Sequence, residues 1–140
     1  MKGLTGDAFY ARATEGGRAM TDETETNQAL AEQWAEAFNT DVEKLITELY
    51  APDCLFNGVE YGQDRMLRFE RRVLAAAPQR SIRIEKTHAV DDVVTVEAVL
   101  LDPDRGADWK LPFCAVLTWR DGKVVSDNTY TDMSRWPGMK

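Results

Sequence analysis

The sequence has few of the residues that metal and redox sites require. It contains one histidine and two cysteines, and Cys54 and Cys114 lie far apart in the chain. This spacing is not that of metal ligands, so we expect no metal site. Each cysteine lies in an apolar, strand-like run, where a free thiol usually packs as a small hydrophobic group. We therefore predict that both thiols are reduced and buried.

Positive charge is also scarce. The chain has 17 Lys and Arg residues against 24 Asp and Glu residues, for a net charge of −7. Phosphate contacts need clustered basic side chains, so we expect no nucleic-acid partner. The only dense basic cluster in the sequence is interpreted as a solvated helix face, and it consists of Arg65, Arg68, Arg71 and Arg72.

Long apolar runs are absent too. No run approaches the roughly 20 residues that a membrane helix requires, and the first residues do not form a signal-peptide pattern. We therefore expect no membrane partner and a cytoplasmic setting. The 140 residues predict one main domain, and a hydrophobic share of 44% is enough to form its core.

Residues 1–25 are rich in glycine, threonine and charge, and we interpret them as an N-terminal extension or arm. The folded domain is assigned to residues 26–140. Met20 could be an initiator, which would make residues 1–19 upstream sequence. Alternatively, Phe9 and Tyr10 anchor the arm on a partner subunit, and the sequence leaves both possibilities open.

Apolar periodicity predicts three helices. The first begins near Asn27 and shows an apolar residue at every fourth position. Residues 40–43 have the pattern of a capping box, Thr40 to Glu43, and predict a second helix that ends at Ala51-Pro52. A short strand at residues 53–57 and a turn precede a third helix at residues 63–77.

Four strands are predicted after the helices. The Asp121-Gly122 pair is typical of a tight hairpin turn between the last two strands. Helices followed by an antiparallel meander predict an α+β domain with the helices on one face of the sheet. The strands are expected at residues 80–89, 92–101, 109–119 and 123–131.

Three segments carry a resemblance to a known family. They are LYAPDCLFNG after the second helix, YGQDRMLRFE at the start of the third, and RDGKVVSDNTYTD across the last hairpin. With the order of elements, they resemble the nuclear transport factor 2-like (NTF2-like) superfamily, which includes SnoaL-like and ketosteroid-isomerase-like proteins. The resemblance covers about residues 27–132. It implies a cone in which three N-terminal helices pack on a strongly curved antiparallel sheet around an apolar pocket.

The last strand carries the main candidate for catalysis. Family parity implies that Val125, Asp127, Thr129 and Thr131 face the pocket, whereas Val124, Ser126, Asn128 and Tyr130 lie on the convex face, through which we expect a homodimer. A carboxylate among apolar groups loses hydration, which raises its pKa toward neutrality. We predict that Asp127 transfers the proton.

Two further residues are candidate catalytic groups. Asn57 is expected to point inward and either to orient a carbonyl or a water or to bond to the turn before the third helix. His88 would be a second titrating group, because it shares strand parity with Ile82 and Ile84 if no bulge intervenes. The alternative for His88 is exposure at a strand end. Asp132 is interpreted as a structural cap of the following turn.

Ten side chains are expected to line a pocket for an apolar substrate, although aromatic stripes at helical spacing are also typical of a core. Tyr50 is expected in addition to orient a carbonyl or a water. The ten are Trp34, Phe38, Tyr50, Tyr61, Met66, Phe69, Leu111, Phe113, Trp119 and Thr129.

The known catalytic sets of the family do not transfer to this chain. Where proteins similar to limonene epoxide hydrolase have an arginine and an aspartate two positions apart, this chain has Ala98 and Leu100. The carboxylate base of steroid isomerases falls near Asn57 or Gly58.

We therefore predict a small enzyme that needs no metal or organic cofactor and performs proton-transfer chemistry on an apolar, oxygenated molecule such as a polyketide or terpenoid. The reaction would be an isomerisation, cyclisation, dehydration or epoxide opening. The alternative is a non-catalytic protein that binds a small hydrophobic ligand or dimerises as a scaffold. Two or more convergent polar groups in the pocket would favour chemistry, and a lone aspartate at its rim would favour binding.

Overall fold

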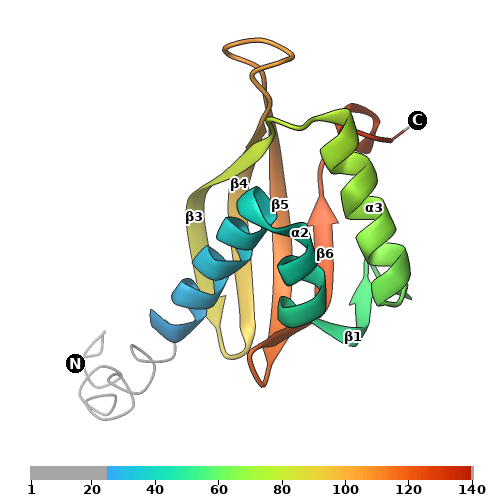
Figure 1. Ribbon diagram of the computed structural model, residues 1–140. Helices are drawn as coiled ribbons and strands as arrows, with labels where there is room; N and C mark the ends of the chain where they lie inside the picture. The colour runs from blue at the N-terminus through green and yellow to red at the C-terminus, as the bar shows by residue number, and fades with distance from the viewer. Residues whose placement is uncertain (1–24, 140) are drawn as a thin grey trace, which may run out of the picture.

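The computed structural model describes residues 25–139 (Figure 1). Phe9, Tyr10 and Met20 lie outside these described residues, so the interpretations of the N-terminal arm stay predictions. Residues 25–40 are helical. The elements that follow are α2 (Val42–Lys44), η1 (Leu45–Leu49), β1 (Tyr50–Phe56), β2 (Val59–Glu60), α3 (Gln63–Ala76), β3 (Ser81–Val90), β4 (Val93–Leu101), β5 (Lys110–Arg120), β6 (Lys123–Tyr130) and η2 (Met133–Arg135).

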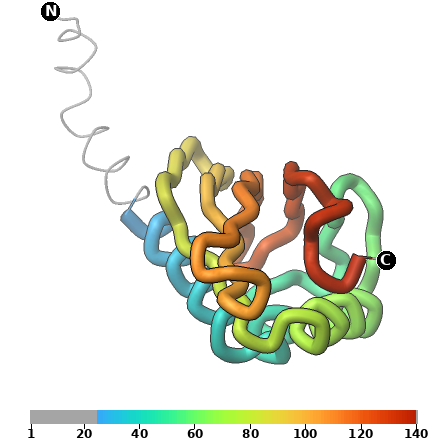
Figure 2. The backbone as a smooth tube through the Cα atoms, turned by 90° about the horizontal axis from the view of Figure 1, so that it is seen from above, coloured from blue at the N-terminus to red at the C-terminus, as the bar shows by residue number. Residues whose placement is uncertain are grey.

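The strands form one six-stranded sheet in the order β2-β1-β6-β5-β4-β3. β1 pairs with β6 in parallel, whereas the other neighbouring pairs are antiparallel, so the sheet is mixed. Seen along the strands, the sheet curves into an arc, and the helices lie within it (Figure 2). This arrangement confirms the predicted α+β cone and the strand expected at residues 53–57, but the parallel pairing of β1 makes the sheet mixed and not antiparallel throughout.

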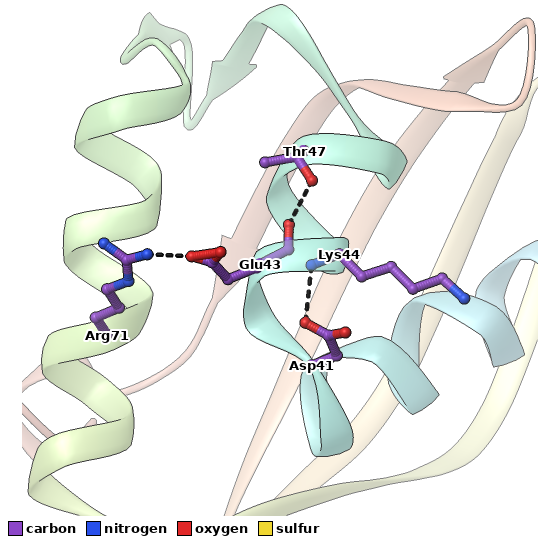
Figure 3. A network of polar contacts seen from close by, with 5 residues as sticks. All are labelled: Asp41, Glu43, Lys44, Thr47 and Arg71. Atoms are coloured by element: carbon purple, nitrogen blue, oxygen red, sulfur yellow. Dashed lines mark hydrogen bonds and ion pairs between the residues drawn. The ribbon is translucent and has the colours of Figure 1, made fainter.

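The second helix begins one residue later than predicted. Asp41, not Thr40, is its N-cap, and the Asp41 carboxylate accepts a hydrogen bond from the Lys44 backbone N–H at 3.0 Å (Figure 3). The Thr40 hydroxyl instead donates to the Glu36 carbonyl. The helix continues from α2 into η1, a π-helical turn, and ends at Leu49. Tyr50 is therefore the first residue of β1 and not the last of the helix.

Two β-bulges change which side chains face inward. In β6, Ser126 pairs with Thr118 but Val124 pairs with Trp119, so Val125 is an extra residue. Val124 is consequently fully buried, and the prediction that it lies on the convex face while Val125 faces inward is wrong. Asp127 lies beyond the bulge and faces inward as predicted.

The second bulge lies in β3 between Ile84 and Lys86. It reverses the alternation of the strand, because one added residue turns every later side chain to the other face. His88 therefore does not share the inward face of Ile82.

Candidate functional site

Two adjoining cavities open between the helices and the concave face of the sheet. The inner chamber has a volume of about 40 Å³, which is room for two or three waters. The outer cleft has a volume of about 380 Å³, within the range of small-molecule sites. Both are lined by Phe56, Asn57, Phe69, Glu70 and Met133, so the cleft leads directly into the chamber.

Asp127 lies at the inner chamber with only 2% of its surface exposed. The Tyr50 hydroxyl donates to Oδ2 at 2.5 Å, and the Thr129 hydroxyl donates to Oδ1 at 2.7 Å. Burial raises the pKa of the Asp127 carboxyl above its ordinary value, while these two hydrogen bonds act in the opposite direction. Asp127 is thus a buried carboxyl with a fixed orientation.

Tyr50 joins Asp127 to the first helix. The Trp34 indole N–H donates to the Tyr50 oxygen at 2.9 Å, and the tyrosine in turn donates to Asp127. Burial, followed by the charge of Asp127, raises the pKa of Tyr50 well above its ordinary value. Tyr50 therefore remains a protonated donor at neutral pH. The chain of donors crosses three segments: residues 25–40, β1 and β6.

Glu70 is a second carboxyl at the site that the sequence reading missed. It lies on α3, four residues after the buried Met66 and three before the buried Val73, and it lines both cavities. An acid within the apolar stripe of a helix was the signal that could have identified it. Its Oε1 is inaccessible to solvent and has no hydrogen-bond partner among residues 25–139.

The surroundings of Glu70 favour its protonated form. Burial raises its pKa to about 7, Arg80 opposes the rise, and the charge of Asp127 adds to it. Arg80 is itself buried, donates to the Phe38 carbonyl at 3.0 Å and lies over the Phe38 ring at 4.1 Å. The site therefore contains two carboxyls, of which Asp127 accepts two hydrogen bonds and Glu70 none from the described residues.

Asn57 lines both cavities and lies in the turn between β1 and β2. Its side-chain oxygen accepts from the Thr129 backbone N–H at 2.9 Å, and its backbone N–H donates to the Asp127 carbonyl at 2.8 Å. The structural bond that was expected with the turn before the third helix is thus made with β6 instead. Asn57 holds the β1–β2 turn against the strand that carries Asp127.

The structure separates His88 from this site. Because of the bulge in β3, His88 lies on the convex face, where its Nε2 is 3.1 Å from Glu97 Oε2. The expectation that His88 is a second titrating group of the pocket is therefore wrong, and the exposed alternative is correct.

The predicted lining residues divide into three groups. Trp34, Phe38, Tyr50, Phe69, Phe113 and Thr129 line the inner chamber. Tyr61 and Met66 line the outer cleft, as Phe69 also does. Leu111 and Trp119 line neither cavity but are buried in the core, so their expected place in the pocket is wrong.

The remaining polar candidates are structural. Asp132 caps η2 as predicted, accepting from the Ser134 backbone N–H at 3.1 Å.

Cys54 is buried and free, and burial raises the pKa of its thiol to about 12. Cys114 is free but only half-buried. Among residues 25–139, no three His, Cys, Asp or Glu side chains gather as a metal site would require, and no helix is long and apolar enough to cross a bilayer.

Comparisons with known proteins agree with this architecture. The profile of the SnoaL-like domain family matches residues 31–127. No protein of curated function matches the chain.

Many solved structures have the same fold. IdmH from Streptomyces antibioticus, a candidate polyketide cyclase, has a TM-score of 0.67 and 17% identity over 79% of this chain and 94% of its own. A protein with a ketosteroid isomerase-like fold from Catenulispora acidiphila, in complex with trimethylamine, has a TM-score of 0.65 and 26% identity over 76% and 88%. A SnoaL-like polyketide cyclase from Agrobacterium tumefaciens has a TM-score of 0.66 and 9% identity over 76% and 91%.

Proposed function

The chain belongs to the family of SnoaL-like domains, and we propose that it is an enzyme that transfers protons on an apolar, oxygenated small molecule such as a polyketide, in a reaction of the cyclase type. The similarity to polyketide cyclases supports a role of this class.

The observation that carries the proposal is the convergence of polar groups in an otherwise apolar chamber. Asp127, Glu70, Tyr50, Thr129 and Asn57 all line the inner chamber. A buried polar group is costly unless it is bonded, and Glu70 Oε1 has no partner among residues 25–139. Two carboxyls whose environments differ in this way are typical of an acid and base pair.

Asp127 is assigned as the base and Glu70 as the acid. The hydrogen bonds from Tyr50 and Thr129 stabilise the ionised form of Asp127. Burial, to which the charge of an ionised Asp127 adds, favours the protonated form of Glu70 and raises its pKa to about 7. Near neutrality the site therefore holds a proton acceptor and a proton donor together.

In the first step, Asp127 removes a proton from the carbon next to a substrate carbonyl. The electron pair of the C–H bond forms a C=C bond, and the π electron pair of the carbonyl moves to its oxygen, which takes the proton of Glu70 to give an enol. In a cyclisation, the enol carbon then forms a C–C bond to a second carbonyl carbon. Asp127 gives its proton to the new alkoxide and Glu70 recovers the enol proton, so both carboxyls return to their starting states.

The sizes of the cavities are consistent with this division. The inner chamber of about 40 Å³ is too small for a whole polyketide, whereas the outer cleft of about 380 Å³ can hold one. The reacting carbonyl would enter between Asp127 and Glu70 while the rest of the molecule stays in the cleft.

The proposal can be tested before the natural substrate is known. We expect the protein to accelerate the exchange of the α-protons of 2-tetralone in D₂O, followed by NMR. Asp127→Asn should keep the fold but reduce the accelerated rate by about a hundredfold or more, the usual contribution of a general base. The control is Asp132→Asn, which removes a structural carboxylate at η2 and should leave the rate unchanged.

Non-catalytic binding remains the second candidate, because both Asp127 oxygens already accept internal hydrogen bonds. Binding of 2-tetralone without accelerated exchange would support this second candidate and count against the enzyme. Equal exchange rates for the parent protein and Asp127→Asn would exclude Asp127 as the base.

A further inference from the structure

The four arginines of α3 are all exposed to solvent, but they differ in what they lie against. Arg65, Arg68 and Arg72 follow one another at spacings of three and four residues, and all three line the outer cleft. Arg71 is not among the residues that line the cleft, and it forms an ion pair with Glu43 of α2 (Figure 3). The interpretation of the cluster as a solvated helix face is therefore confirmed, and three of its members in addition line the outer cleft.

Two of the three cleft arginines are available to a ligand. The Arg65 guanidinium lies 3.9 Å from the centroid of the Tyr61 ring. A guanidinium stacked on an aromatic ring is held in place while its N–H edges remain free to donate in its plane. Arg68 forms no hydrogen bond or ion pair with residues 25–139.

The third arginine has a structural role. Arg72 Nε donates to the Gly138 carbonyl at 3.0 Å and so binds the C-terminal segment to α3. Arg65 and Arg68 remain as the two cleft arginines whose N–H groups donate no hydrogen bond to a described residue.

The charge of the cleft contrasts with that of the chain. The chain carries −7 overall, yet the side chains lining the outer cleft include three arginines and one carboxyl, that of Glu70. The carboxyl lies toward the inner chamber, which it also lines together with Asp127. An anionic group is thus attracted to the outer end of the site and repelled by an ionised Asp127 at the inner end.

We propose that Arg65 and Arg68 bind a carboxylate of the substrate, so that the ligand is an amphipathic acid with its apolar, oxygenated part directed toward Asp127. A planar carboxylate matches the forked geometry of the guanidinium donors. This inference rests on the proposed function for the identity of the site, but it concerns binding, which can be measured without turnover. It also fixes the direction in which the substrate enters.

The test compares two probes with the same ring system, one charged and one neutral: 2-naphthoate and its methyl ester. Binding of each is measured by calorimetry or fluorescence to the parent protein and to Arg65→Gln, Arg68→Gln and Arg71→Gln. We expect each of the first two substitutions to weaken the binding of 2-naphthoate by about tenfold, the usual effect of removing a charged hydrogen bond. Binding of the ester should change less than twofold.

Arg71→Gln is the matched control. It removes the same charge from the same helix but at a position outside the cleft, so binding of 2-naphthoate should be nearly unchanged. Equal weakening by Arg71→Gln would indicate general charge attraction and would overturn the proposal. The proposal would also be overturned if neither Arg65→Gln nor Arg68→Gln weakened the binding of 2-naphthoate. A third probe, 2-naphthyl phosphate, gives the last outcome: arginine-dependent binding of the phosphate but not of 2-naphthoate would overturn the proposal too.

The outcome is separable from that of the proposed function. Asp127→Asn should retain arginine-dependent binding of 2-naphthoate, because Asp127 lines the inner chamber and not the outer cleft. If 2-tetralone exchange fails while this binding persists, the carboxylate site stands and the assigned chemistry does not.

Discussion

At the scale of single residues, Asp127 and Glu70 show how burial and hydrogen bonding together set the proton affinity of an acid. Burial raises the pKa of both. Two donated hydrogen bonds stabilise the charge of Asp127, whereas Glu70 Oε1 has no such partner among residues 25–139. Under the proposed function, this difference would make Asp127 the base and Glu70 the acid.

The first residue-scale prediction concerns stability and pH. The pKa of Glu70 rises from 4.5 to about 7 on folding, so the folded state holds this proton more tightly than the unfolded state. The stability that this proton provides is complete below pH 4.5 and is lost as the pH rises through about 7. In urea unfolding from pH 4 to 8, the parent protein should lose roughly 3 kcal/mol relative to Glu70→Gln.

The control for this change is Glu60→Gln, which removes a carboxylate from the exposed strand β2. Its stability should follow that of the parent protein across the same pH range. A parent protein and a Glu70→Gln variant with parallel pH profiles would show that Glu70 is ionised normally.

The second residue-scale prediction concerns Tyr50→Phe. The change removes the donor to Asp127 Oδ2 and leaves the Trp34 N–H without its acceptor. Because this hydrogen bond lowers the pKa of Asp127, its loss should raise that pKa further. The acidic limb of the 2-tetralone exchange profile should move to higher pH by roughly one to two units. An unchanged limb would mean that Tyr50 does not control the base.

The residues that the sequence predicted and those it missed differ in their local pattern. Alternation along the last strand identified Asp127, because no bulge lies between it and Tyr130. The same alternation failed for Val124 and His88, since each lies beyond an inserted residue that leaves no mark in composition. Glu70 was missed because only the apolar members of the helix stripe were considered.

At the scale of elements, the sequence predicted most of the fold. The observed strands β3 to β6 begin and end within one residue of the predicted ranges, because their apolar runs are bounded by turn residues. Asp121 and Gly122 both have positive φ, as the hairpin prediction requires. The π-helical turn of η1 was not foreseen, and it places Tyr50 on β1 beside the strand of Asp127.

The C-terminal segment is an element whose docking depends on one glycine. Gly138 has φ of 81°, and a Cβ there would lie 3.2 Å from the Arg72 carbonyl oxygen and 3.3 Å from the Val73 nitrogen. These are backbone atoms of α3 and cannot move aside easily. The neighbouring Trp136 packs edge-on against Phe113, with ring centroids 5.3 Å apart, and Met139 lines the outer cleft.

The element-scale prediction is that Gly138→Ala undocks this segment. We expect a loss of about 1 to 3 kcal/mol in urea unfolding, from the strained φ together with the contact. The control is Gly122→Ala, which has a similar φ of 77° but no atom within 4 Å of its Cβ, and which should lose less. Gly138→Ala should also weaken 2-naphthoate binding, since Met139 would leave the cleft. Equal losses in the two variants would show that the close contact has no effect.

At the scale of the whole molecule, the two faces of the sheet differ in what covers them. The concave face is covered by the helices (Figure 2), and Asp127 on this side lines the inner chamber. On the convex side, Leu55 is 43% exposed and Tyr130 is 62% exposed, and both are large apolar or aromatic groups. Exposed groups of this kind on a sheet face are typical of an interface.

We predict that the protein forms a homodimer through this convex face, with Ser126, Asn128 and Tyr130 near the contact. Sedimentation should show a dimer at micromolar concentration, and Tyr130→Asp should shift it toward monomer, because a buried, unpaired carboxylate is costly. Val59→Asp is the control: Val59 is 50% exposed on the short edge strand β2, away from the predicted contact. A monomeric parent protein, or a dimer that Tyr130→Asp leaves intact, would contradict the prediction.

Since Asp127 faces the opposite side of the sheet, a monomeric Tyr130→Asp variant should retain the acceleration of 2-tetralone exchange.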